Sequence, residues 1–187
     1  FRAALPPGRL GAELVPLAAS LGRIVAQTLP ARADAPPFDR ASVDGFALRA
    51  ADTAAASEAA PIRLRLNAEV LACGVAPGIE VAPGTATAIA TGAMIPRGAD
   101  AVAMIEWTEL EDAGDGPVIQ LSRALAPGQF IGFAGSDIAR GEALLRAGAQ
   151  ISSREIGMLA AAGWSEVPVV RRPVVAVIST GDELHPP

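Results

Sequence analysis

Lysine is absent from this sequence of 187 residues, and cysteine and histidine occur once each. All fifteen basic side chains are therefore arginines, spread from Arg2 to Arg172 without a basic block, and 20 acidic residues bring the formal net charge to −5. This charge distribution does not favour a nucleic-acid-binding surface. The single Cys73 cannot form an internal disulfide, and the single His185 leaves no cluster for zinc or haem and lacks a Gly-x-Ser-x-Gly nucleophile motif.

Long apolar runs are also missing. No run approaches the roughly 18 to 20 residues that cross a bilayer, and the longest β-branched run, residues 174–178, has the length of a strand. The sequence therefore predicts no membrane-spanning helix. Aromatic residues make up only 4% of an alanine-rich chain, so we expect a core of small and aliphatic side chains.

The two ends indicate a piece of a longer protein. The chain begins at Phe1 rather than Met, and no charged segment followed by an apolar one marks a signal peptide. Near the other end, an apolar strand over 173–179 leads into a polar turn, as at the start of a parallel α/β sheet. Such a strand needs neighbours, so we expect the sequence to be the front part of its protein.

Apolar spacing predicts two helices that flank a β-rich block. The first helix covers 16–28, and the second runs from a cap at Ser152 or Ser153 to about 162, with Gly163 as its stop. Between them, Ala-Pro-Gly and Gly-Asp-Gly turns separate short pieces typical of a small β-barrel or sandwich. The predicted strands in this block are 45–49, 61–72, 85–91, 101–110 and 116–122, and two more follow the second helix at 166–171 and 173–179. The order of elements predicts that the β block is inserted into another unit.

Four short segments combine glycine with carboxylates or hydroxyls, at 36–47, 91–106, 135–142 and 179–184. Asp-Gly, Thr-Gly and Asp–Arg combinations in the first three are also found in ordinary turns, loops and surface pairs. The fourth follows an apolar strand, where open α/β sheets place ligands, although an N-cap would use the same residue types. The segments offer oxygen donors without histidine or cysteine, which favours Mg²⁺ with an oxyanion over a soft metal.

Taken in order, these segments resemble the molybdopterin molybdotransferase family, which includes the bacterial MoeA proteins and the gephyrin E domain. Thr-Gly-Ala-x-x-Pro-x-Gly-Ala-Asp-Ala-Val at 91–102 and Ser-Thr-Gly-Asp-Glu-Leu at 179–184 carry the resemblance. It implies insertion of molybdenum from molybdate into adenylated molybdopterin, with Mg²⁺-dependent release of AMP, by a cytoplasmic homodimer. This piece alone would be inactive.

The resemblance also implies a fold and its boundaries. The fold class is α+β, with an elongated linking domain at 1–31 and 142–172. A mostly β, barrel-like domain is inserted at 32–141, and the first strand of a truncated α/β domain follows at 173–187.

The site residues come from the same resemblance, position by position. The implied catalytic residues, which are also possible Mg²⁺ ligands, are Asp44, Asp137 and Glu183. The implied cofactor-binding residues are Thr91, Gly92, Ser179, Thr180 and Gly181. Asp39, in the same segment as Asp44, is assigned no role.

Two motifs depart from the family pattern. Phe-Asp-Asn-Ser-Ala-Met-Asp-Gly stands as Phe-Asp-Arg-Ala-Ser-Val-Asp-Gly at 38–45, and Phe130 and Gly132 replace the Asn and Arg of Asn-Val-Arg-x-x-Gly-Glu-Asp. Losing a charge-assisted contact costs about 1.5 to 3 kcal/mol, a tenfold to more than hundredfold loss of anion affinity. Arg40 is a candidate to replace the charge. Two alternatives stay open: a non-catalytic paralogue that acts as a dimerising scaffold or a pterin- or anion-binding module, and a shared fold with some other anion as ligand.

Overall fold

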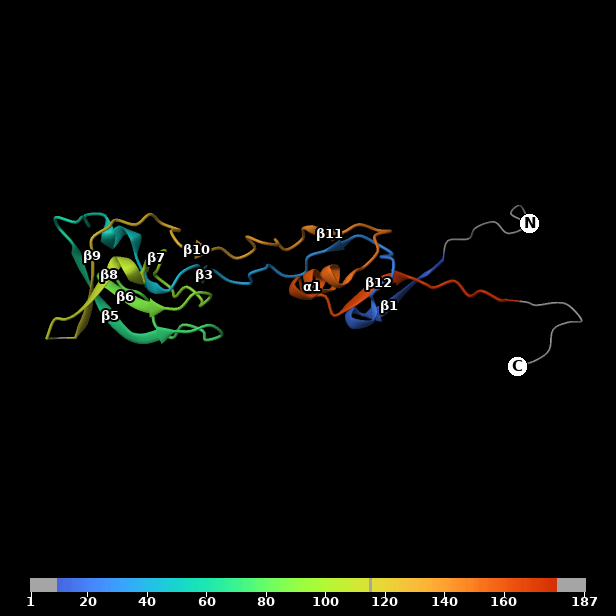
Figure 1. Ribbon diagram of the computed structural model, residues 1–187, viewed down its shortest axis with the longest axis horizontal. Coiled ribbons are helices and arrows are strands. Elements are labelled where there is room, and N and C mark those ends of the chain that lie inside the picture. The colour runs from blue at the N-terminus through green and yellow to red at the C-terminus, as the bar shows by residue number, and fades with distance from the viewer. Residues whose placement is uncertain (1–9, 115, 178–187) are drawn as a thin grey trace, which may run out of the picture. The chain divides into compact units, whose positions relative to one another are not determined.

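A computed structural model describes residues 10–114 and 116–177 of the chain. Contacts between residues divide it into two units (Figure 1). The first unit contains the described parts of 1–32 and 141–187, and the inserted unit contains 33–140. The described chain is mostly β with one α-helix.

The inserted unit is built around a curled sheet (Figure 1). Its strand order is β7-β4-β6-β5-β9-β8, and all neighbours are antiparallel except β5 and β6. The strands are β4 (Gly45–Leu48), β5 (Ile62–Leu71), β6 (Thr85–Ile89), β7 (Ala101–Met104), β8 (Thr108–Asp112) and β9 (Pro117–Leu121). In this coarser form the barrel-like β prediction is confirmed, as an open half-barrel.

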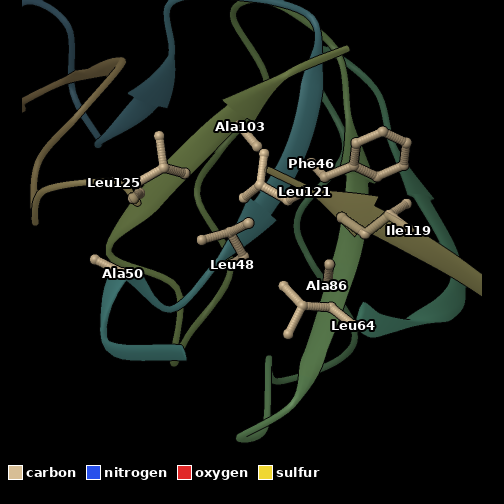
Figure 2. Close-up of a cluster of buried hydrophobic side chains, with 10 residues drawn as sticks. Phe46, Leu48, Ala50, Leu64, Ala86, Ala103, Ile119, Leu121 and Leu125 are labelled. Atoms are coloured by element: carbon tan, nitrogen blue, oxygen red, sulfur yellow. The ribbon is translucent and has the colours of Figure 1, made fainter. Parts of the chain in front are cut away.

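Small and aliphatic side chains form the core of this sheet. Every residue of β4 is buried, with Phe46 and Leu48 in one apolar cluster and Ala47 in another. Figure 2 shows the first cluster, in which Leu48 lies among residues such as Leu121 from other strands. Alanines at many of these positions match the small aliphatic core that the composition predicts.

Short elements complete the inserted unit. Strand β3 (Arg40–Ala41) pairs with β10 (Ile131–Gly132). Two 3₁₀ helices, η2 (Ala50–Thr53) and η3 (Ile105–Trp107), follow β4 and β7. The strand predicted at 101–110 is therefore two strands, because η3 separates β7, which pairs with β4, from β8, which pairs with β9.

The first unit is built from two small sheets and one helix. Strand β1 (Ala12–Pro16) pairs with β12 (Glu166–Val170), and β2 (Leu29–Pro30) pairs with β11 (Ala143–Leu145). A 3₁₀ turn, η1 (Leu17–Ala19), follows β1. Helix α1 (Ser153–Ala161) begins after a Ser152 cap, as predicted.

The helix predicted over 16–28 is wrong. Only η1 is helical there, and Gly22 has a φ of 74° that breaks the turn. Backbone N–H groups that a helix would use bond instead to carbonyls far along the chain: Gly22 to Ile151 at 2.8 Å, Val25 to Ala149 at 2.8 Å and Ala26 to Pro168 at 3.0 Å. The apolar spacing therefore reflects packing of an extended segment against the rest of the unit.

The last predicted strand, 173–179, lies partly outside the described residues. Its described part, 173–177, forms no strand, and Val174, Val175 and Val177 are exposed. In the ranges 10–114 and 116–177, no helix is long and apolar enough to cross a membrane.

Candidate functional site

Three of the four polar segments meet in the inserted unit around the strip formed by residues 40–42. On one side of the strip, Gly92 donates its N–H to the Ala41 carbonyl at 2.8 Å, and Ala41 donates to Ala93 at 2.9 Å. On the other side, Ser42 donates to the Phe130 carbonyl at 2.9 Å. The strip therefore holds two segments together that lie far apart in the sequence.

Exposed polar side chains lie on both sides of the buried Ala41 along this part of the chain. Ala41 is buried in an apolar cluster, whereas Arg40, Ser42 and Asp44 are exposed. Ser42 was not singled out from the sequence. We call the exposed side chains of Arg40, Ser42, Asp44, Thr91 and Asp137 the polar face.

Asp44 and Thr91 are directly bonded on this face. The Asp44 Oδ1 accepts hydrogen bonds from the Thr91 backbone N–H at 2.7 Å and from Thr91 Oγ1 at 2.9 Å. These bonds, the backbone one first, lower the pKa of Asp44 below the usual range of an aspartate. The anionic form of Asp44 is thereby favoured further, and Oδ2 is the oxygen that can meet a cation or a water.

Gly92 forms the tight turn that follows Thr91. Its φ of 82° is unfavourable for other residues, and an added Cβ would lie 2.9 Å from Cys73 Sγ. Cys73 in turn donates to the Thr91 carbonyl at 2.9 Å. The position of Thr91 is thus fixed by its neighbours on both sides.

Arg40 and Asp137 lie together at the other end of the polar face. Their side chains form an ion pair at 3.6 Å, with Arg40 Nη2 facing Asp137 Oδ2, and both are substantially exposed. An exposed pair of this kind contributes about 0 to 1 kcal/mol to stability.

The segment that precedes Asp137 in the sequence contains a strained residue just before β10. Phe130, at the family's Asn position, has a φ of 58°, which bulky residues rarely adopt. Its ring packs edge-on against Trp107, with the ring centres 5.4 Å apart. Asp39 also acts here, because its Oδ1 accepts the Ala134 N–H at 2.8 Å and thereby holds the segment after β10.

The remaining predicted residues cannot be placed. Ser179, Thr180, Gly181 and Glu183 lie outside the described residues. Within the described ranges, no three histidine, cysteine or acidic side chains come close enough to hold a metal ion. The predicted roles of Asp44, Asp137, Thr91 and Gly92 stay predictions.

A hollow of about 390 Å³ beside the strip was not predicted. Its lining includes Met94, which pairs with Arg40 through backbone bonds, and the charged Glu80 and Arg97. Nothing in the local sequence pattern distinguishes these residues from an ordinary loop.

Fold and site together define a β domain inserted into a second unit, with an exposed face of carboxylate, hydroxyl and guanidinium groups. The sequence matches the family described as "MoeA N-terminal region (domain I and II)" over residues 2–163. The chain belongs to this family, which confirms the resemblance seen in its motifs.

Relatives include the molybdopterin molybdenumtransferase of Bacillus subtilis (strain 168), which is 41% identical over 172 residues, covering 92% of this chain and 40% of that protein. The enzyme of the same name from Synechococcus elongatus is 37% identical over 177 residues, covering 95% of this chain and 43% of that protein. A crystal structure of a molybdopterin biosynthesis moea protein from Pyrococcus horikosii matches with a TM-score of 0.83 at 38% identity, covering 88% of this chain and 41% of that one. The chain thus spans about two fifths of the length of these relatives.

Proposed function

We propose that this chain is part of a molybdopterin molybdotransferase, which inserts molybdenum from molybdate into adenylated molybdopterin and releases AMP. Family membership and 41% identity to a molybdopterin molybdenumtransferase support the proposal. The structural observation that carries it is the polar face, where three separated motifs present an anionic Asp44, an ordered Thr91 and the Arg40–Asp137 pair.

Three residues of the face, Thr91, Asp44 and Asp137, have distinct tasks in this proposal. Thr91 favours the ionised form of Asp44, whose pKa it lowers, and fixes the direction of the carboxylate through two hydrogen bonds. Ionised Asp44 orients a water or a cation beside the phosphates of the substrate, and Asp137 contributes a second carboxylate to the same face. Glu183 and the 179–181 segment would complete the site.

Mg²⁺ fits the donors on this face. The face offers carboxylate and hydroxyl oxygens, which Mg²⁺ prefers, and Mg²⁺ is commonly held by one or two carboxylates together with substrate phosphates and waters. Asp44, Asp137 and Glu183 are the residues that would hold it. Bound there, the ion would neutralise negative charge on the phosphates as AMP leaves.

The activity can be tested with the complete gene product. Incubation with adenylated molybdopterin, molybdate and Mg²⁺ should release AMP, and a reaction without molybdate serves as the control. Failure to release AMP under these conditions would refute the enzymatic proposal and favour the scaffold alternative. A protein ending at Pro187 should release none, because it lacks most of the length of its relatives.

We also propose that the complete protein is a homodimer assembled through the first unit. That unit exposes the apolar side chains of Leu14 and Leu21, at 66% and 59%. The choice of this unit as the dimer contact follows the family resemblance, and these two leucines are the side chains that the contact would cover. Light scattering should report twice the monomer mass at micromolar concentration, and a strict monomer would refute the proposal.

A further inference from the structure

We propose that Arg40 is the anion-binding residue of the polar face, that Gly132 is the position that makes room for it, and that its ligand is an oxyanion. The inference deepens the proposed function and rests on it for the identity of the oxyanion, a phosphate group or molybdate. Its geometric basis is independent of the reaction.

The register of two short strands places Arg40 beside Gly132. Strands β3 and β10 pair antiparallel, with Arg40 opposite Gly132 and Ala41 opposite Ile131. Directly opposed residues in an antiparallel pair have side chains on the same face. A side chain at position 132 would therefore emerge beside the side chain of Arg40.

The space at position 132 is already bordered by Arg40. A Cβ added to Gly132 would lie 3.6 Å from Arg40 Cγ and 3.7 Å from Arg40 Nε, with Ser42 Oγ at 3.6 Å. These are ordinary contact distances, so a methyl group fits. A longer side chain would compete with the Arg40 stem for the same space.

Backbone conformation does not explain the glycine. Gly132 is not one of the glycines with a positive φ in this structure, so another residue could adopt its backbone geometry. The family motif carries an arginine at this position, and here the arginine stands on the paired strand instead. The structure thus places an arginine cation on this face, carried by β3.

The guanidinium of Arg40 is accessible to a ligand and is not held in a close hydrogen bond with Asp137. The Arg40 side chain is 45% exposed, and its 3.6 Å separation from Asp137 exceeds a hydrogen-bond distance. Asp137 thus steers the guanidinium without engaging it closely. Its planar fork of N–H donors matches phosphate-type oxyanions.

The test measures binding of two probes to the complete protein by calorimetry, inorganic pyrophosphate in one arm and molybdate in the other. Whichever probe the unchanged protein binds, Arg40→Gln should lower the affinity for it by about tenfold or more. Arg63→Gln is the matched control, because Arg63 is an exposed arginine of the same unit that pairs with Glu111 at 2.9 Å. Arg63→Gln removes the same charge and should leave the affinity for the probe within about twofold of that of the unchanged protein.

Position 132 provides a second test that leaves the charge unchanged. Gly132→Ala should bind as the unchanged protein does, whereas Gly132→Leu should weaken binding as strongly as Arg40→Gln. The double variant Arg40→Gln with Gly132→Arg returns the charge to the opposite strand and should regain affinity. Melting curves check that each variant is folded, and if Gly132→Leu does not fold, the double variant decides the role of position 132.

The outcomes separate this inference from the proposed function. It is overturned if neither probe binds, if Arg40→Gln binds like Arg63→Gln, or if the double variant gains nothing over Arg40→Gln. Loss of binding on Arg40→Gln together with regain in the double variant supports it, even where the complete protein releases no AMP. The AMP assay alone decides the enzymatic proposal.

Discussion

At the scale of single residues, the charge on Asp44 can be removed while its hydrogen bonds are kept. In Asp44→Asn the amide oxygen can accept both Thr91 bonds, which reach a single oxygen of the aspartate. If the charge serves the reaction, AMP release by the complete protein should fall about tenfold or more. The melting temperature should move by less than about 3 °C, since no buried group changes.

Asp112→Asn is the matched control for this prediction. Asp112 also accepts a backbone N–H, from Gly114 at 2.9 Å, but it lies at the end of β8 and outside the polar face. Its replacement should leave AMP release unchanged. Equal activity of the two variants would show that Asp44 is a turn residue only.

Residue identity could be predicted at this scale, but bonding partners could not. Asp44 and Thr91 stand out in the sequence because each precedes a glycine in a polar motif, yet the bonds between them span 47 positions. Asp39 shows the reverse case. It was assigned no role, although it bonds across 95 positions to Ala134.

At the scale of elements, helix α1 owes its start to a capping box that depends on pH. Glu155 accepts hydrogen bonds from the Ser152 hydroxyl and backbone N–H, and these, the hydroxyl first, lower the pKa of Glu155. Because the folded pKa lies below the unfolded value of about 4.3, the stabilisation is complete above that pH. It is lost as pH falls through the folded pKa.

Glu155→Gln should therefore flatten this acid dependence. Glutamine keeps the capping geometry but does not titrate, so the variant should lose less stability than the unchanged protein between pH 7 and pH 3. Urea unfolding at both pH values measures the difference. The same acid loss in both proteins would assign the effect to other carboxylates, such as Asp44, whose pKa is lowered as well.

Two glycines in regular elements should respond oppositely to alanine. An added Cβ at Gly157, exposed in α1, meets nothing within 4 Å, so Gly157→Ala should stabilise by about 1 kcal/mol. At Gly45 in β4, a Cβ would lie 1.8 Å from the Ala103 carbonyl oxygen. Gly45→Ala should destabilise by roughly 3 kcal/mol or more, and thermal melts that rank the two variants the other way would contradict both predictions.

Elements with local signals were predictable, and elements shaped by distant partners were not. Ser152 and Gly163 bracket α1 correctly because caps act within one turn. The apolar residues of 16–28 repeat at helical spacing, yet the backbone of Val25 bonds to Ala149 and β1 pairs with β12. Long-range bonds of that kind leave no sequence signal.

At the scale of the whole molecule, the inserted unit has its own apolar core, and hydrogen bonds join the two ends of its chain segment. Both apolar clusters of the sheet draw all their members from within 33–140. The two ends of this range are held together, because Arg140 donates its N–H to Asp34 Oδ1 at 2.8 Å and Ala35 donates to the Ile138 carbonyl at 2.9 Å. These bonds would keep the two ends of the inserted unit together in a protein without the rest of the chain.

A protein consisting of residues 33–140 should therefore fold alone, with cooperative thermal unfolding and dispersed amide NMR signals. A protein of residues 45–125 is the matched control. It retains the six strands but lacks β3 and β10, so Ala41, Phe130 and Ile131 no longer cover the second apolar cluster. It should melt at a lower temperature or fail to fold. If 33–140 were unfolded, the inserted unit would depend on the first unit for stability; if the shorter protein melted at the same temperature, the strip at 40–42 would serve the polar face alone and add nothing to the fold.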